Sequence, residues 1–264
     1  AILRPHGIIL VTGPTGSGKT TTLYSVLSRL NNSRVNIMTL EDPVEYEMIG
    51  VNQVQINPGA GLTFATGLRS FLRQDPNIVL VGEIRDSETT GLAVQAALTG
   101  HLVFSTLHTN NASGAIPRLL DLGAEAFLIA SALNAIVGQR ICRKICPSCR
   151  SQIKPDAAVI ENIKTVLGNL LPKDKEIVLY KGIGNINGSV CTSCGGSGYF
   201  GRIGMFEVFA VTPSISKLIL SHAPMSEIET LAIAESMITM KQDGYLKALE
   251  GITTLEEVLR VAQD

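Results

Sequence analysis

Short apolar runs alternate with helix-forming stretches through the first half of the chain. Residues 8–11 form an apolar run typical of a strand, and a glycine-rich turn separates it from helix-forming residues 19–30. The same alternation predicts strands at 36–40, 78–81 and 102–106, and helices at 63–74 and 87–98. This order is typical of an α/β fold with a mainly parallel sheet and helices on both faces.

The pattern changes near residue 140. Helical signals continue over residues 112–140, after which cysteine, proline and glycine are frequent up to about residue 204. From residue 212 the chain again has the pattern of helices. We therefore expect a core over residues 1–140, a small subdomain over 141–204 and a helical C-terminal subdomain over 205–264.

Composition narrows the classes of partner. The 264 residues include 22 Lys and Arg against 23 Asp and Glu, a net charge of −1 that provides no overall field to attract nucleic acid. The longest uncharged apolar stretch, residues 126–138, is shorter than the roughly 20 residues of a membrane-spanning helix. The N-terminus has no signal-peptide pattern. We expect a cytoplasmic fragment of a longer protein, with no direct nucleic-acid partner.

Residues 13–20 match the phosphate-binding pattern G-x-x-x-x-G-K-[ST] in full, between a predicted strand and a predicted helix. The matching residues are Gly13, Pro14, Thr15, Gly16, Ser17, Gly18, Lys19 and Thr20. In such loops backbone N–H groups and the helix N-terminus bind phosphates, the lysine reaches the β- and γ-phosphates, and the threonine ligates Mg²⁺. The flanking elements argue against a simple glycine-rich turn, so we expect ATP and Mg²⁺ to bind here.

Acidic side chains follow two of the other predicted strands. Glu83 ends an apolar strand, and Gly82 precedes it where many P-loop ATPases have aspartate. Glu83 would contact Mg²⁺ through water or orient the attacking water, unless it is a surface carboxylate. Glu41 and then Glu45 are candidates to position the lytic water, and a solvated turn is the alternative. The division of roles between Glu41 and Glu83 stays open.

Histidine and arginine complete the set of candidates. His108 follows the strand at 102–106 and could donate a hydrogen bond toward the γ-phosphate. Arg69 and Arg73 lie four residues apart on one predicted helix, and Arg85 and Arg118 lie near other element ends. A guanidinium suits the charge of the transition state, but each arginine could equally be a structural ion-pair partner.

Four cysteines form a C-x₂-C…C-x₂-C set. They are Cys146, Cys149, Cys191 and Cys194. Two such pairs supply the four thiolates of a tetrahedral Zn²⁺ site, and four protein ligands leave no open position for catalysis. Two disulfides are the alternative, which a cytosolic location disfavours. We expect a structural zinc ion, with Cys142 outside the site.

Taken together, these motifs resemble the ATPase family of type II secretion and type IV pilus assembly over nearly the whole chain. The P-loop, the acidic segment 39–45, the strand 78–83 with its Gly82 and the segment 106–108 match motifs of that family. The segment 68–76 matches a family motif in which arginines act near a nucleotide or across a subunit contact, which favours Arg69 and Arg73. The cysteines resemble those of the assembly-type members.

The resemblance implies a RecA-like P-loop NTPase core, followed by a small zinc-binding subdomain and a helical tail. It also implies a hexameric ring that hydrolyses ATP at the inner membrane, with an inner-membrane platform protein and a cytoplasmic adaptor as partners. A preceding domain would contribute to the nucleotide pocket. Membrane association would then be peripheral, through those partners.

Two other functions remain open at this stage. The same motor could serve DNA uptake, which uses a closely similar machine. The chain could also be a switch that binds ATP without turnover, although the combination of Glu41, Glu83 and His108 argues against a pure binding module. A zinc-ribbon nucleic-acid module lacks the surrounding basic and aromatic residues that such binding uses.

Overall fold

The computed structural model describes residues 1–171 and 176–262 and divides the chain into two units. Unit 1 comprises residues 1–138 and 208–237, and unit 2 comprises residues 139–207 and 238–264. The strands β6 (Leu133–Ile145) and β11 (Tyr199–Ala210) have residues in both units. Buried apolar residues form separate cores in the two units.

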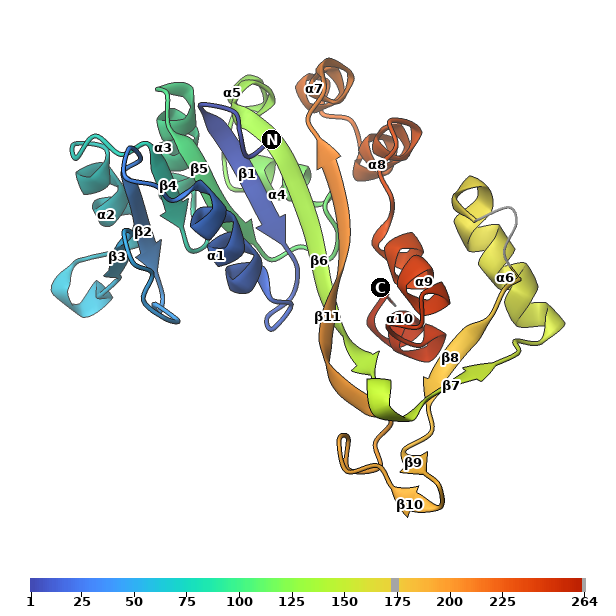
Figure 1. Ribbon diagram of the computed structural model, residues 1–264. Coiled ribbons are helices and arrows are strands. Elements are labelled where there is room, and N and C mark those ends of the chain that lie inside the picture. Colours follow the sequence, from blue (N-terminus) through green and yellow to red (C-terminus); the bar gives the residue numbers. More distant parts are fainter. Residues whose placement is uncertain (172–175, 263–264) are drawn as a thin grey trace. The chain divides into compact units, whose positions relative to one another are not determined.

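Unit 1 alternates strands and helices as its hydrophobic pattern predicts (Figure 1). Before β6 its elements are β1 (Gly7–Thr12), α1 (Lys19–Leu30), β2 (Ile37–Glu41), β3 (Asn52–Gln55), η1 (Pro58–Ala60), α2 (Phe64–Phe71), β4 (Ile78–Val81), α3 (Ser87–Leu98), β5 (Leu102–Leu107), α4 (Ala115–Asp121) and α5 (Ala126–Ala132). After β11 follow α7 (Pro213–Leu220) and α8 (Met225–Ala234). The predicted helices at 19–30 and 87–98 are confirmed as α1 and α3.

The sheet has the strand order β11-β6-β1-β5-β4-β2-β3. The pairs β1–β5, β5–β4, β4–β2, β2–β3 and β1–β6 are all parallel, which confirms the predicted α/β class. Parallel strands present their carboxyl ends at one edge of the sheet. The segments after β1, β2, β4 and β5 therefore begin along the same edge.

Alternating side chains of the strands pack on the two faces of this sheet. In β1, Ile9 and Val11 join the core under α1 together with Leu23 and Leu27, whereas Ile8 joins the core of the opposite face. That second core also holds buried side chains of α2, α3, α4, α5, α7 and α8. Strands buried on both faces explain the continuous apolar runs in the sequence.

The prediction of helix over residues 112–140 is wrong beyond Ala132, where β6 begins. Residues 133–138 instead pair in parallel with β1, Leu10 facing Ile136 and Val11 facing Val137. A strand at this position satisfies the backbone groups on the second edge of β1, and its β-branched side chains suit a pleated surface. Sheet pairing therefore overrides the helical pattern of the local sequence after Ala132.

The described residues of unit 2 form three α-helices and several short strands. Besides residues of β6 and β11 it contains η2 (Pro147–Cys149), β7 (Arg150–Ile153), α6 (Ala157–Leu167), η3 (Gly168–Leu170), β8 (Leu179–Gly182), β9 (Asn185–Ile186), β10 (Ser189–Val190), α9 (Met240–Leu249) and α10 (Leu255–Ala262). Antiparallel pairs join β7 to β8 and β9 to β10. Its core packs α6, α9 and α10 around buried Met205 and Tyr245.

The last four helices are divided between the units. Helices α7 and α8 belong to unit 1, whereas α9 and α10 belong to unit 2. The three domains predicted with boundaries near residues 140 and 204 stay a prediction. The two units group residues by packing, and each unit contains two separate stretches of sequence.

Candidate functional site

The segment between β1 and α1 has the backbone of a phosphate-binding loop. Gly13, Gly16 and Gly18 have φ angles of 146°, 77° and 84°, in the region that glycine adopts without strain. No side chain caps α1 at Gly18, so the N–H groups of its first turn point out of the helix toward an incoming anion. The sequence therefore folds here as the motif predicts.

Lys19 lies inside this loop. Its Nζ donates hydrogen bonds to the carbonyl oxygens of Gly13, at 2.8 Å, and Pro14, at 3.0 Å. Burial lowers the pKa of Lys19, and the nearby Glu83 carboxylate partly opposes that shift. The structure thus places one carboxylate, that of Glu83, close enough to the loop lysine to influence its charge.

The carboxylate of Glu83, just after β4, contacts the side chains of Arg85 and His108. Its Oε2 lies 2.7 Å from Arg85 Nε and 3.4 Å from His108 Nε2, and its side chain is 13% exposed. The backbone around it is fixed, because Ile84 N donates to Thr106 O at 3.1 Å and Thr106 Oγ1 donates to Gly82 O at 2.7 Å. The structure therefore brings Lys19, Glu83 and His108 together.

Gly82 has a packing reason to be glycine. A Cβ atom there would lie 3.1 Å from Leu40 O, 3.4 Å from the Cα of Glu41 and 3.4 Å from a ring carbon of Phe64. Its N–H also donates to Leu40 O at 2.7 Å, so β2 and β4 approach closely at this point. The position where other P-loop ATPases have aspartate has no room here for a side chain without a shift of β2.

Glu41 has a different environment from Glu83. Its carboxylate is buried, with the residue 3% exposed, and accepts hydrogen bonds from Thr39 Oγ1 at 2.5 Å and Gln53 Nε2 at 3.2 Å. The hydroxyl of Tyr24 on α1 donates to its other oxygen. Sequence reasoning missed Tyr24 and Gln53, since neither belongs to a motif and a tyrosine in a helix usually reads as core.

The remaining acidic residues of this segment are on the surface. Asp42, Glu45 and Glu47 are exposed, and the Asp42–Pro43 peptide bond is cis. Glu45 donates its backbone N–H to the Tyr24 hydroxyl at 3.4 Å. Glu45 is therefore placed next to Glu41 by its backbone, while its carboxylate faces solvent.

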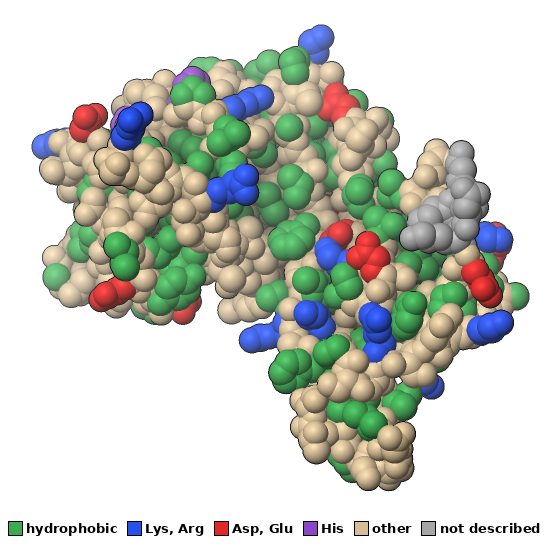
Figure 2. Space-filling view, in the orientation of Figure 1, with side chains coloured by type: hydrophobic (Ala, Val, Ile, Leu, Met, Phe, Trp, Pro, Cys, Tyr) green, Lys and Arg blue, Asp and Glu red, His purple; other side chains and the backbone are tan. Residues whose placement is uncertain are grey.

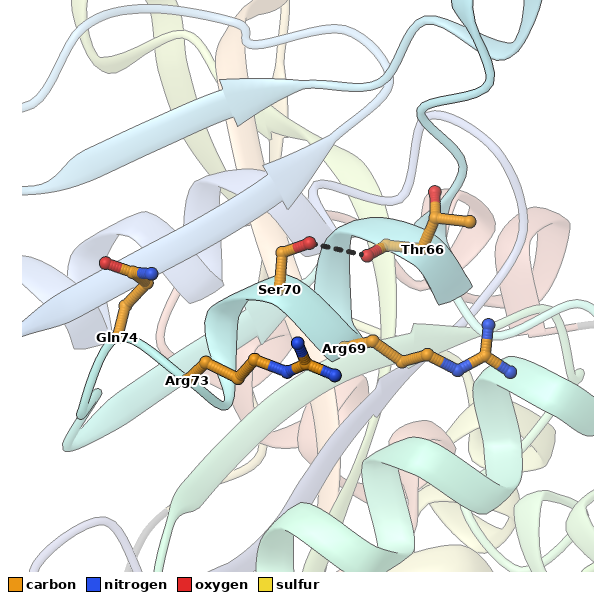
Figure 3. Close-up of a pocket in the computed structure, with 5 residues that line it drawn as sticks. All are labelled: Thr66, Arg69, Ser70, Arg73 and Gln74. Atoms are coloured by element: carbon orange, nitrogen blue, oxygen red, sulfur yellow. Dashed lines mark hydrogen bonds between the residues drawn. The ribbon is translucent and has the colours of Figure 1, made fainter.

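Arg69 lies on α2, whereas Arg73 lies just after this helix, which ends at Phe71 and not at residue 74 as predicted. Figure 3 shows Arg69 and Arg73 extending from a groove that Thr66, Ser70 and Gln74 also line. Arg69 forms an ion pair with Glu88 of α3. Within unit 1 it is Arg85, and not these two, that contacts Glu83. The role of Arg69 and Arg73 as trans-acting groups stays a prediction.

The four predicted metal ligands converge in unit 2. The Sγ atoms of Cys146, Cys149, Cys191 and Cys194 all lie within 4.8 Å of one another. Two of the separations are 3.9 Å, between Cys146 and Cys191, and 3.7 Å, between Cys149 and Cys194. Thiolates about 2.3 Å from a tetrahedral zinc ion lie about 3.8 Å apart, so this donor set fits that ion.

The same distances argue against the alternative of two disulfides. A disulfide requires sulfur atoms about 2.05 Å apart, and all five cysteines of the chain are free. Burial raises the pKa of Cys149 to about 12, whereas hydrogen bonds from the Gly198 N–H and from neighbouring thiols outweigh burial and lower the pKa of Cys194 to about 7. Cys142 is buried in β6 outside this cluster, as predicted.

Glycines allow two backbone segments to close around the cysteines. A Cβ atom on Gly182 would lie 1.9 Å from Gly198 O, and one on Gly184 would lie 2.2 Å from Gly196 O. Cys191 N donates to Gly184 O at 2.9 Å, which ties the second cysteine pair to the strand β8 segment. The close contact between these two backbone segments thus helps to bring the four sulfur atoms together.

The surface charge has no dominant sign on the face in Figure 2. Among the described residues seen there, Lys and Arg side chains form separate small groups between neutral and acidic ones. None of the described helices is both long and apolar enough to span a membrane.

Proteins of known sequence resemble this chain over nearly its full length. The Type IV pilus assembly ATPase PilB of Thermus thermophilus is 49% identical over 258 residues, 98% of this chain and 28% of that protein. The Type II secretion system protein E of Xanthomonas campestris pv. campestris is 50% identical over 261 residues, 99% of this chain and 44% of that protein. The chain therefore spans half or less of these relatives.

Solved structures give the same picture of the fold. The crystal structure of the pilus retraction motor PilT with bound ADP aligns with a TM-score of 0.71 and 30% identity, over 100% of this chain and 63% of that chain. The Legionella pneumophila ATPase DotB has a TM-score of 0.67 at 23% identity, over 98% of this chain and 61% of that one, a likeness of fold. The family model for Type II/IV secretion system protein matches residues 1–260, and the chain therefore belongs to that family.

Proposed function

We propose that this chain is the nucleotide-hydrolysing core of a motor for type II secretion or type IV pilus assembly. The observation that carries the proposal is the contact between Glu83 and His108 at neighbouring strand ends, near Lys19 of the P-loop. Such a grouping supplies a cation for phosphate and a carboxylate for the attacking water. The names of the relatives in pilus assembly and type II secretion support the motor function.

The residues of the P-loop fit ATP with Mg²⁺. The uncapped first turn of α1 and the buried Lys19 suit the phosphates, and Thr20 follows Lys19 on the helix to offer a hydroxyl for the metal ion. Mg²⁺ bound there would neutralise phosphate charge. Glu83 would orient the lytic water, with Arg85 and His108 holding its carboxylate in place.

The four cysteines would hold Zn²⁺ in a structural role. All four ligand positions are occupied by sulfur, so no position remains for a reacting water. Their residues lie in unit 2, whereas the nucleotide residues lie in unit 1. The zinc ion would therefore stabilise unit 2 and take no part in hydrolysis.

The proposal includes assembly. We expect the motor to work as a hexameric ring on the cytoplasmic side of the inner membrane, bound peripherally through a platform protein and an adaptor. The relatives are components of such secretion and pilus machines by name. Arg69 of α2, or Arg73 just after it, would then contact a neighbouring subunit from the groove that both arginines line.

The test is the ATPase rate of the purified protein against its concentration, with molar mass measured by light scattering in the same samples. We expect the rate to rise steeply with assembly and to fall to background in Glu83→Gln. Glu161→Gln, an exposed carboxylate on α6, is the matched control and should keep the wild-type rate. Nucleotide binding without turnover in the assembled wild type would refute the motor and support a switch.

A further inference from the structure

The hydroxyl of Tyr24 connects more groups than packing requires. Tyr24 is 1% exposed on α1, and its hydroxyl donates to Glu41 Oε2. The same oxygen accepts from Gln53 Nε2 at 3.2 Å and from the backbone N–H of Glu45 at 3.4 Å. One oxygen atom thus joins the helix of the P-loop, the end of β2, the segment after it and β3.

Glu41 in turn depends on these donors for its position. A buried carboxylate needs hydrogen bonds to offset its lost hydration, and here Tyr24, Thr39 and Gln53 supply them. Thr39 and Gln53 both contact Oε1, so among these three donors Tyr24 alone contacts Oε2. The orientation of the carboxylate about its own axis is therefore fixed by the tyrosine.

The contact also ties the exposed acidic segment to the P-loop helix. The rings of Tyr24 and Tyr46 meet edge to face, with centroids 4.6 Å apart and planes at 82°. Gln53 Nε2 reaches Tyr46 O at 3.2 Å, and Gln53 Oε1 accepts from Met48 N at 2.6 Å. Residues 42–48 are thus attached to α1 through one aromatic pair and one amide.

Tyr24 lies on the same face of α1 as a residue of the P-loop. Tyr24 follows Thr20 by four residues, which is about one helical turn and places the two side chains on one face. Leu40, which precedes Glu41, pairs with Val81 of β4, two residues before Glu83. Glu41 therefore stands beside the strand end that carries Glu83, and Tyr24 stands beside the P-loop.

We propose that Tyr24 is a positioning residue for ATP hydrolysis, which fixes Glu41 and residues 42–48 relative to the helix that carries Lys19 and Thr20. This role rests on the proposed function and adds a residue to it. Tyr24 itself touches no reacting atom. Its effect on the rate passes through Glu41.

The test is Tyr24→Phe, which keeps the ring, its burial and its contact with Tyr46 but removes the hydroxyl. We expect kcat to fall about 10- to 100-fold, the equivalent of one hydrogen bond to a charged group, with KM for ATP changed less than threefold. In a Glu41→Gln background the same change should lower kcat by less than about twofold, since the route through Glu41 is already lost.

Tyr245→Phe is the matched control, because Tyr245 is 0% exposed on α9 in unit 2 and its hydroxyl donates to Asn162 Oδ1 at 2.7 Å. It should lower Tm as much as Tyr24→Phe does and leave kcat unchanged. Two results would overturn the positioning role: a wild-type kcat in Tyr24→Phe, or a loss in the Glu41→Gln background as large as the loss in the wild-type background. If Glu83→Gln is inactive in the same assay, the proposed function still stands. Absence of hydrolysis in the wild type overturns the proposed function as well.

Discussion

A buried carboxylate on helix α10, that of Glu257, binds Arg143 of β6 and Arg260, and removing its charge should give a measurable loss of stability. Glu257 is 2% exposed. It accepts from Arg143 N at 3.0 Å, Arg143 Nη2 at 2.6 Å, Arg260 Nε at 2.9 Å and Arg260 Nη2 at 2.8 Å. Thr254 caps the same helix by accepting from Glu257 N at 3.2 Å. Glu257→Gln keeps the shape of the side chain and removes its charge.

The size of the loss follows from the exposure of the partners. Removing one partner of a fully buried ion pair costs about 3–5 kcal/mol because the other charge is left unpaired. Here the side chains of Arg143 and Arg260 are 51% and 58% exposed and can return to water. The glutamine oxygen also keeps part of the hydrogen bonding. We therefore expect Glu257→Gln to lower the free energy of unfolding by about 2–3 kcal/mol at neutral pH.

The loss should depend on pH with a definite sign. Burial alone would raise the pKa of Glu257, but the hydrogen bonds from Arg260 and Arg143 outweigh it and hold the pKa well below its usual range. A depressed pKa contributes stability that is fully present above the unfolded value near 4.3 and is lost as pH falls toward the folded value. The difference between wild type and Glu257→Gln should therefore shrink below about pH 4.3.

Hydrogen exchange of peptides from α9 and α10, read by mass spectrometry during urea titration, reports on unit 2 directly. Glu256→Gln is the control, since Glu256 is exposed on the same helix and carries the same charge. We expect it to change stability by less than about 0.5 kcal/mol. Equal effects of the two variants at pH 7, or a difference that grows on acidification, would refute the assignment of the stability to the buried carboxylate.

Two further predictions concern the cysteine cluster. Cys191→Ser should release bound zinc, measured by metal analysis, and lower the Tm of unit 2, while Cys142→Ser, a buried cysteine outside the cluster, should keep the metal. Gly182→Ala should destabilise unit 2 by more than about 2 kcal/mol in urea unfolding, because its Cβ would lie 1.9 Å from Gly198 O. Gly91→Ala, in open space on α3, should be neutral or stabilising.

Local chemistry allowed some elements to be predicted to the residue. The helix after the P-loop begins at Lys19 and ends at Leu30 as expected, because the glycine-rich turn and the polar residues after Leu30 mark both ends. Thr63 caps α2 and accepts from Thr66 N at 3.2 Å, close to the predicted start at residue 63. Ser226 and Glu229 have the spacing of a capping box, but α8 begins at Met225, after Pro224. A capping pattern alone therefore does not show at which residue a helix begins.

Elements that depend on distant partners were harder to predict. Strand β3 is short and half exposed, and its Gln53 has a role only because Glu41 and Tyr46 lie next to it. Gly244 is typical of a helix end but lies inside α9, where a Cβ would approach Met205 and Val258 within 2.7 Å. That glycine is explained by close packing, which no local pattern reveals.

The acidic positions show why motif and geometry must be combined. Sequence alone left the roles of Glu41 and Glu83 open, since each lies at the end of an apolar strand. Only the structure shows that Glu83 contacts Arg85 and His108 while Glu41 is enclosed by Tyr24 and its partners. The close approach of β2 and β4 at Gly82 sets the two carboxylates side by side in the sheet but in different surroundings. A carboxylate at the edge can act on a ligand, whereas an enclosed one can hold its neighbours in place, so we expect Glu83 to act on the nucleotide and Glu41 to position the segments around it.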